Sequence, residues 1–182
     1  MTFPILTTPR LRLVEVEPGH SSALFTIFSN TEVVRYYGMD PMHELAQAEK
    51  IIEHFKSTYE TKRGMRWAIT IKEGNRFVGT IGLNNLALSM KKAEIGFEIH
   101  PDFWRSGITS EALQAVLDYS FDELGLHRMG AVTFPANLAS IGLLEKNGFV
   151  EEGKLRSYLF QNGHSHDALV FSILHTEWNL ND

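Results

Sequence analysis

The stretch FWRSGITS, residues 103–110, has a composition that suits an anion-binding site. It contains no acidic residue, and it leads into a segment whose apolar spacing predicts a helix. The N-terminus of a helix attracts anions, because it offers unpaired backbone N–H groups at the positive end of the helix dipole. Gly107 would let a ligand approach the backbone closely. The sequence therefore predicts an anion site here, although a glycine-containing turn between a strand and a helix often binds nothing.

The loop follows neither of two common phosphate-binding patterns. Both G-x-x-x-x-G-K-[ST], typical of P-loops, and G-x-G-x-x-G, typical of dinucleotide sites, are missing from the sequence. A second polar pair, Asn137 and Ser140, stands at the start of another expected helix. Both residue types are favoured helix caps, so capping alone would explain this pair.

Two carboxylates and two imidazoles lie on expected strands. Glu94 and Glu98 are four residues apart, which places them on one face of their strand. Either could act as a general base, and either could equally be an ordinary solvated side chain. His164 and His166 also share a strand face and could form a metal-binding pair. Because they directly follow a hairpin signal, we favour a surface position for both and expect no metal site.

Length and composition indicate one folded domain spanning residues 1–182, with 43% hydrophobic and 21% charged residues. The net charge of −5 argues against a broad nucleic-acid-binding face and weakly favours cationic partners. We find no apolar run of the roughly 20 residues that a membrane helix needs, and no signal peptide. Cysteine is absent, which excludes thiolate chemistry and makes the cytoplasm the expected location.

The hydrophobic pattern predicts an α/β fold. The expected strands cover residues 10–16, 66–72, 76–87, 91–100 and 128–134, followed by two strands around Asn162-Gly163. The expected helices cover residues 20–28 and 43–62, a segment from the anion loop to about Gly125, and residues 138–147. Residues 30–42 are too irregular to assign. The result is a mixed, mostly antiparallel sheet of about seven strands with about four helices.

The segment AEIGFEIHPDFWRSGITSEALQAVLDYSFDELGLHRMGAVTFPANLASIGLLEKNGF, residues 93–149, resembles the central region of the GCN5-related N-acetyltransferases (GNAT). Within them it is most similar to the ribosomal-protein N-terminal acetyltransferases. The pieces TTPRLRLVEVEP, FVGTIGL and EEGKLRSYLFQNG agree with this resemblance, which runs from about residue 7 to the last strand.

The resemblance implies that acetyl-CoA is the cosubstrate. Its pyrophosphate would lie at the helix N-terminus, and its pantetheine arm would lie between two splayed parallel strands, residues 91–100 and 128–134. The cofactor-binding residues implied in this way are Ile99, His100, Trp104, Arg105, Ser106, Gly107, Ile108, Thr109 and Asn137. Trp104 stands where many members of the family have Gln or Arg, although aromatic residues are usual in this subgroup, and Arg105 and Thr109 replace smaller residues. These changes add bulk that could narrow the loop, or add groups that bind phosphate.

The reaction that the resemblance implies is direct attack of an amine on the thioester. Ser140 is the candidate acid, donating a hydrogen bond or a proton to the sulfur, although a capping or pantetheine contact is an equal alternative. Close relatives have a glutamate where this sequence has Leu159, and Glu98 is the candidate base because the resemblance places it where other acetyltransferases have one. A backbone N–H at Ile99 or His100 would stabilise the oxyanion. A serine hydrolase is a poor alternative, since the sequence has no G-x-S-x-G motif.

The acceptor amine is the part of the reaction that the sequence defines least. Tyr36, Tyr37 and Met39 are expected to line its groove, although they could belong to the core. The resemblance favours a protein N-terminal α-amine, such as that of a ribosomal protein, with a polyamine as the alternative. An inactive CoA-binding regulatory module is the alternative of a different class, favoured by Leu159. The chain is expected to be a monomer or homodimer, with no direct contact to nucleic acid or membrane.

Overall fold

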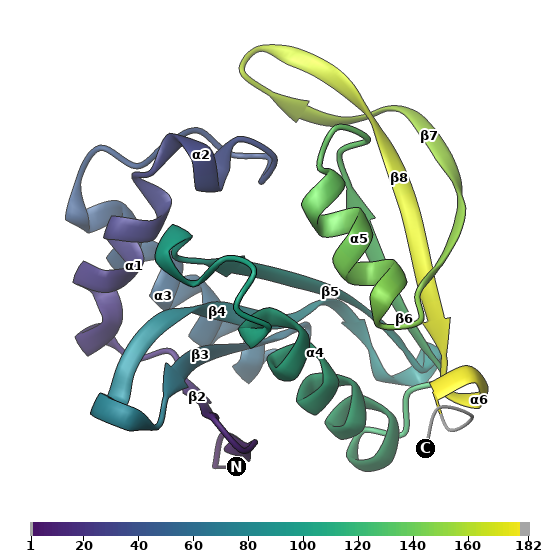
Figure 1. Ribbon diagram of the computed structural model, residues 1–182, viewed down its shortest axis with the longest axis horizontal. Helices are drawn as coiled ribbons and strands as arrows, with labels where there is room; N and C mark the ends of the chain where they lie inside the picture. The colour runs from purple at the N-terminus through teal and green to yellow at the C-terminus, as the bar shows by residue number, and fades with distance from the viewer. Residues whose placement is uncertain (1, 179–182) are drawn as a thin grey trace.

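A computed structural model describes residues 2–178, which form an eight-stranded mixed sheet covered by helices on both faces (Figure 1). The strands are β1 (Leu6–Thr7), β2 (Leu11–Glu15), β3 (Met65–Ile71), β4 (Arg76–Ala87), β5 (Lys92–Ile99), β6 (Arg128–Thr133), β7 (Val150–Gln161) and β8 (His164–Leu174). The helices are α1 (Ser21–Phe28), α2 (Thr31–Val34), α3 (Leu45–Glu60), α4 (Ile108–Asp118), α5 (Leu138–Lys146) and α6 (His175–Trp178). None of these helices combines the length and apolarity needed to cross a bilayer.

The strand order is β1-β2-β3-β4-β5-β6-β8-β7, and β5 and β6 are the one parallel pair among the described strands. Their connection contains α4, which crosses back over the sheet as a parallel connection requires. The pair is joined at three register positions only, the last of which is Glu94 opposite Gly130. Beyond that position the two strands separate, and the gap is bordered by β5 as far as Ile99 and by β6 as far as Thr133.

The two faces of the sheet are covered by different helices. On one face α4 buries Leu113 and Leu117 in the larger apolar core, which also contains Trp67. On the other face α1 and α3 bury Phe28 and Ile52 in a smaller core. The smaller core under α1 and α3 ends before β6. On this face, β5 and β6 therefore carry polar residues that the helices do not bury.

The α/β prediction is confirmed, with two corrections to the number of elements. The described sheet has eight strands rather than about seven, because the two-residue β1 pairs with β2. The described α-helices number six rather than about four, because α2 and α6 are single turns of four residues too short to show periodicity. The helix expected over residues 43–62 begins only at Leu45, where Glu44 and Gln47 form a capping box.

Candidate functional site

The backbone groups at the end of β5 border the gap between β5 and β6. The N–H of His100 donates to the carbonyl of Val78 on β4 at 2.8 Å. Backbone groups alternate in direction along an antiparallel pair, so the N–H of Ile99 is directed to the opposite edge, toward the gap. The N–H groups of Ile99 and His100 were the two expected donors to the oxyanion. That of His100 is already hydrogen-bonded within the sheet.

The expected anion loop joins the end of β5 to α4. Gly107 is the N-cap of α4 with φ = 80°, a left-handed conformation that glycine adopts without strain. Arg105 has φ = 60°, which is uncommon for a residue with a side chain. Three loop side chains are exposed (Trp104, Arg105 and Ser106), whereas that of Ile108 is buried in the core. Ile108 could therefore contribute only its backbone N–H to an anion.

Two loop side chains already have partners. The ring Nε1–H of Trp104 donates to the Ile99 carbonyl at 2.8 Å, and the Ser106 hydroxyl donates to the Phe103 carbonyl at 2.5 Å. The Ile99 carbonyl faces the same gap as its N–H, so Trp104 occupies a group that the resemblance assigned to the pantetheine arm. An arm lying along β5 would therefore meet Trp104 at this carbonyl.

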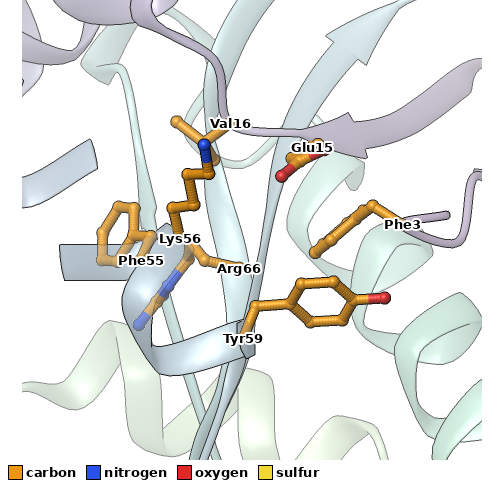
Figure 2. A pocket seen from close by; sticks show the side chains of 7 residues that line it. All are labelled: Phe3, Glu15, Val16, Phe55, Lys56, Tyr59 and Arg66. Carbon is orange, nitrogen blue, oxygen red and sulfur yellow. The ribbon is translucent and has the colours of Figure 1, made fainter. Parts of the chain in front are cut away.

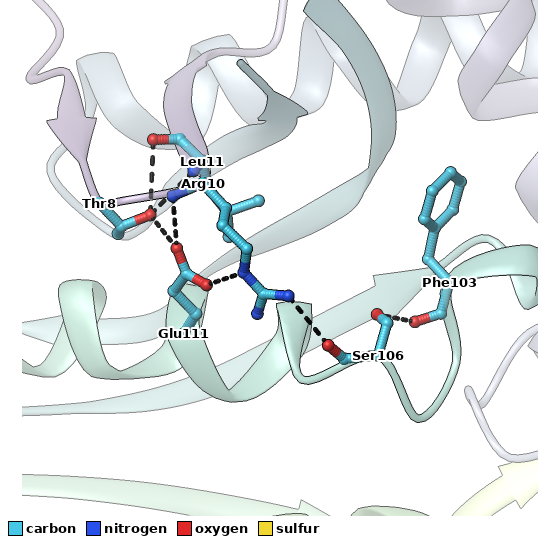
Figure 3. A network of polar contacts seen from close by, with 6 residues as sticks. All are labelled: Thr8, Arg10, Leu11, Phe103, Ser106 and Glu111. Carbon is cyan, nitrogen blue, oxygen red and sulfur yellow. Dashed lines mark hydrogen bonds and ion pairs between the residues drawn. The ribbon is translucent and has the colours of Figure 1, made fainter. Parts of the chain in front are cut away.

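An ion pair between Arg10 and Glu111, which the sequence did not reveal, lies beside the loop (Figure 3). Arg10 donates through Nε to Glu111 in the first turn of α4 at 2.6 Å, and through Nη1 to the Ser106 carbonyl at 3.1 Å. The Thr8 hydroxyl and the Arg10 backbone N–H both donate to the other Glu111 oxygen, at 2.5 and 2.9 Å. The N-terminal segment is therefore fixed to α4, and a guanidinium lies beside Gly107.

Glu98 is not the solvated strand carboxylate that remained one possibility, because it is only 3% exposed. It accepts hydrogen bonds from the hydroxyls of Tyr37, at 2.8 Å, and Thr80. Burial raises the pKa of Glu98, while Arg66 and the two hydroxyls act in the opposite direction. Burial, with the charge of Glu98 next, also raises the pKa of Tyr37, which therefore keeps its proton at neutral pH.

Arg66 is the buried counterion of this carboxylate, with Nη1 3.6 Å from Glu98. Its guanidinium donates to the Gly96 carbonyl and to the Asn84 side chain, each at 2.9 Å, and lies over the Phe55 ring. Figure 2 shows the stem of Arg66 beside Phe55 at a cavity of about 10 Å³, enough for one water. The ion pair is therefore part of the packing between α3 and the sheet.

Gln161, at the end of β7, holds the segment that carries the expected groove residues. Its side chain is 5% exposed. Its Nε2 donates to the carbonyls of Val34, at 2.9 Å, and Met39, at 3.0 Å, while its Oε1 accepts from the Gly38 N–H at 3.1 Å. These bonds join the β7–β8 hairpin to residues 34–39 across the sheet, a connection that the sequence did not reveal.

The three expected groove residues therefore have different surroundings. Tyr37 is bound to Glu98, and Met39 packs against the smaller core. The Tyr36 ring lies 5.9 Å from the ring of Phe134, just beyond β6, and the Phe134 ring lies 5.4 Å from that of His166. Tyr36 is thus the one of the three that faces the end of β6.

Asn137 and Ser140 meet at the start of α5. The Asn137 side-chain oxygen accepts the Ser140 backbone N–H at 3.2 Å, which is the helix cap that their residue types predict. This cap leaves the Asn137 amide nitrogen and the Ser140 hydroxyl for other contacts, and both residues are partly exposed. Capping is therefore compatible with the roles that the resemblance implied.

A polar basin lies where β5 and β6 are still paired, on the sheet face opposite α4. Its volume is about 360 Å³. Asn85, Lys92, Glu94 and Arg128 line it together with Gly130 and four apolar residues. The sequence reasoning placed Glu94 on the face of Glu98, and the structure gives the two carboxylates opposite surroundings: Glu94 lines the basin and Glu98 is buried.

At one side of the basin Arg128 forms a two-point ion pair with Glu152, with Nη1 to Oε1 at 2.6 Å. The hydrogen bond from Arg128 and a second from Ser172 lower the pKa of Glu152 from 4.5 to about 2. A carboxyl whose pKa is lowered by folding stabilises the fold above its unfolded pKa and loses that contribution as the pH falls toward the folded value.

We therefore expect the melting temperature to drop as the pH is lowered from 4.5 toward about 2, and Glu152→Gln to reduce this drop. Thermal unfolding followed by circular dichroism across this range measures the effect. The neighbouring exposed Glu151→Gln is the matched control and should leave the acid dependence as it is. Identical acid profiles for the wild type and Glu152→Gln would contradict the assignment.

Within residues 2–178 no group of three or more His, Asp or Glu side chains is arranged to hold a metal ion. His166 lies against Phe134, and its Nε2 is 3.3 Å from the Gln161 carbonyl. His164 is exposed at the start of β8, as the surface prediction has it.

Comparison with known proteins agrees with this arrangement. The family described as "Acetyltransferase (GNAT) domain" matches residues 10–150. The chain is 46% identical to "Uncharacterized N-acetyltransferase YoaA" of Bacillus subtilis, over 94% of this chain and 97% of the relative. It is 33% identical to "Putative ribosomal N-acetyltransferase YdaF" of the same organism, over 92% of each.

A solved structure shows the same fold. Spermidine N-acetyltransferase from Vibrio cholerae, in complex with CoA and spermine, superposes with a TM-score of 0.83 at 23% identity, over 94% of this chain and 99% of that one. The family match covers most of the chain, and both curated relatives exceed the similarity at which a common family is secure. The chain therefore belongs to the GNAT family of N-acetyltransferases, as the resemblance predicted.

Proposed function

We propose that this enzyme transfers the acetyl group of acetyl-CoA to the α-amine of a protein N-terminus. One observation supports the binding of the cofactor. The strands β5 and β6 separate after Glu94 and Gly130, and β5 is followed by residues 103–107, which contain no acidic side chain and lead to the N-terminus of α4. The pantetheine arm would occupy the gap along β5. The pyrophosphate would meet the backbone N–H groups of the loop.

In the proposed reaction the ammonium of the acceptor first loses one proton. The neutral nitrogen attacks the thioester carbonyl carbon, forming the C–N bond while the C–S bond breaks. The second proton of the attacking nitrogen ends on the departing CoA thiolate, so that the products are the amide, CoA thiol and one released proton. The Ile99 N–H would stabilise the oxyanion, and Ser140 would donate to the sulfur.

Glu98 is proposed to act indirectly in this scheme. Its carboxylate is enclosed by Tyr37, Thr80 and Arg66, so it orients these groups rather than meeting the amine. An α-amine needs less help from a strong base, because its pKa is about 7.7–8.0 against about 10.4 for lysine. The absence of the expected glutamate at Leu159 therefore suits an α-amine acceptor.

Two further observations support the acceptor. YdaF, at 33% identity, carries the name of a ribosomal N-acetyltransferase. The net charge of −5 favours a cationic partner such as a basic protein tail. The same charge favours a polyamine, which is the second candidate acceptor.

We expect short peptides with a free N-terminus to be acetylated, and the same peptides with a blocked N-terminus and an internal lysine to react far less. Mass spectrometry of both products locates the acetyl group, and spermidine serves as the third acceptor. Acetylation confined to lysine side chains or to spermidine would contradict the α-amine proposal. Acetyl-CoA binding without release of free CoA thiol, for every acceptor, would indicate an inactive CoA-binding module instead.

A further inference from the structure

The peptide unit between Ser106 and Gly107 is held by an arginine that lies 96 residues before Ser106. Arg10 donates from Nη1 to the Ser106 carbonyl at 3.1 Å, and its Nη2 lies 3.4 Å from the point that a Cβ on Gly107 would occupy. The carbonyl and the N–H of one trans peptide unit point in opposite directions. The bond from Arg10 therefore turns the Gly107 N–H away from the guanidinium and fixes its direction.

Without such a contact the orientation of this peptide unit would be easy to change. Gly107 has φ = 80°, and a residue without a Cβ adopts positive and negative φ almost equally well. Arg105, on the other side of Ser106, has φ = 60°, a conformation that costs energy in a residue with a side chain and persists only where its surroundings support it. The loop therefore depends on contacts from outside it to keep one conformation.

Arg10 also neutralises a carboxylate in the first turn of α4. A charged Glu111 at this end of the helix would repel a second anion bound there. Figure 3 shows its two oxygens accepting from the Arg10 side chain at 2.6 Å, from the Arg10 backbone N–H at 2.9 Å and from the Thr8 hydroxyl at 2.5 Å. The Arg10 side chain is 51% exposed, so this ion pair by itself adds little to stability. Its larger effect is on the charge and the shape of the loop.

We propose that Arg10 is a positioning residue for acetyl-CoA: it holds the peptide unit between Ser106 and Gly107 in the orientation that receives the pyrophosphate, and it neutralises Glu111. The proposal rests on the proposed function, in which the pyrophosphate meets the N–H groups of this loop. A loop that already has its bound conformation loses less entropy when the ligand binds, so support of this kind raises affinity without touching the ligand. The guanidinium suits the role, because its planar fork can bind a carboxylate and a carbonyl at once.

The test compares two thioesters in the variant Arg10→Gln. Calorimetry should show the dissociation constant for acetyl-CoA rising about 3- to 10-fold, the range that one net hydrogen bond gives. S-acetylpantetheine carries the same thioester and arm without the phosphates. We therefore expect kcat/KM for acetyl-CoA to fall by the same factor and kcat/KM for S-acetylpantetheine to stay at the wild-type value. General damage to the fold would lower both.

Two further variants separate positioning from charge. Arg10→Lys keeps the charge but has one nitrogen on a flexible stem, so it should lose acetyl-CoA affinity much as Arg10→Gln does. Glu111→Gln should also weaken acetyl-CoA binding, because Arg10 loses the carboxylate that orients it. If Arg10 merely added a positive charge, removing its partner would free that charge and tighten binding.

Arg12→Gln, which changes an exposed arginine two residues further along the chain, is the matched control and should leave the acetyl-CoA dissociation constant unchanged. Unchanged acetyl-CoA affinity in Arg10→Gln, an equal loss for both thioesters, or tighter acetyl-CoA binding in Glu111→Gln would overturn the proposal. A folded wild type that does not bind acetyl-CoA would instead overturn the proposed function.

Discussion

Replacing Arg66 with methionine is expected to lower the free energy of unfolding by about 3–5 kcal/mol at neutral pH. The guanidinium is 6% exposed and lies 3.6 Å from Glu98, which is itself 3% exposed. Removing it leaves a buried carboxylate with two hydroxyl donors and no counterion, and also leaves the Gly96 carbonyl without this donor. Urea unfolding followed by tryptophan fluorescence measures the loss.

The dependence of this loss on pH tests its cause. Burial already raises the pKa of Glu98, and removing Arg66 should raise it further. A carboxyl with a raised folded pKa favours the fold at low pH and ceases to do so as the pH rises through that value. The difference between the wild type and Arg66→Met should therefore shrink as the pH falls toward 4.5, the ordinary value.

The double variant Arg66→Met with Glu98→Gln provides the thermodynamic cycle. It removes both charges, so we expect it to be more stable than Arg66→Met alone. Arg12→Met, which changes an exposed arginine on the neighbouring strand β2, is the control and should cost little. A loss in Arg66→Met that the second substitution does not reduce would show that packing against Phe55 outweighs the ion pair.

Strand faces could be predicted from the sequence because side chains alternate along a strand. Glu94 and Glu98 were placed on one face in this way, and both do belong to that face. Their burial could not be predicted, since it depends on which elements cover each end of β5. Tyr37, 61 residues before Glu98, encloses that carboxylate, whereas Glu94 lines the basin and is partly exposed.

The anion loop was predicted for similar local reasons. The helical spacing of apolar residues after Gly107 predicts a helix that begins there, and an acid-free stretch before it suits an anion at the positive end of the helix dipole. Its support was not predictable, because Arg10 lies 101 residues before Glu111. The segment TTPRLRLVEVEP contains Arg10 and resembles the family, but this resemblance implied no role for Arg10. Gln161 is a further case, since its contact to Gly38 spans 123 residues.

The gap between β5 and β6 came from the resemblance rather than from any local pattern. Periodicity gave both strands, but it cannot tell a strand pair that remains joined from one that separates. In the structure three paired positions are followed by divergence, and the N–H of Ile99 is directed to the gap because of that divergence. The register between strands that lie far apart in the sequence could therefore be expected only from the family resemblance.

Gly107→Val is expected to weaken acetyl-CoA binding at least 10-fold. Gly107 has φ = 80°, where a β-branched residue is strained, and its Cβ would approach Nη2 of Arg10 to 3.4 Å. The side chain would also project from the loop whose N–H groups are proposed to meet the pyrophosphate. Calorimetric titration gives the dissociation constant. In the wild type, acetyl-CoA at a hundredfold excess over that constant should add about 2.7 kcal/mol of stability.

Gly74 provides the matched control, because it too has a left-handed backbone, with φ = 75°, in the turn between β3 and β4. Gly74→Val should cost a similar 1–2 kcal/mol or so of folding free energy and leave acetyl-CoA binding unchanged. The comparison separates backbone strain from ligand contact, since the two variants share the first and differ in the second. Equal acetyl-CoA affinity in both variants would contradict close approach of the phosphates to Gly107, and no binding by the folded wild type would contradict the acetyl-CoA site itself.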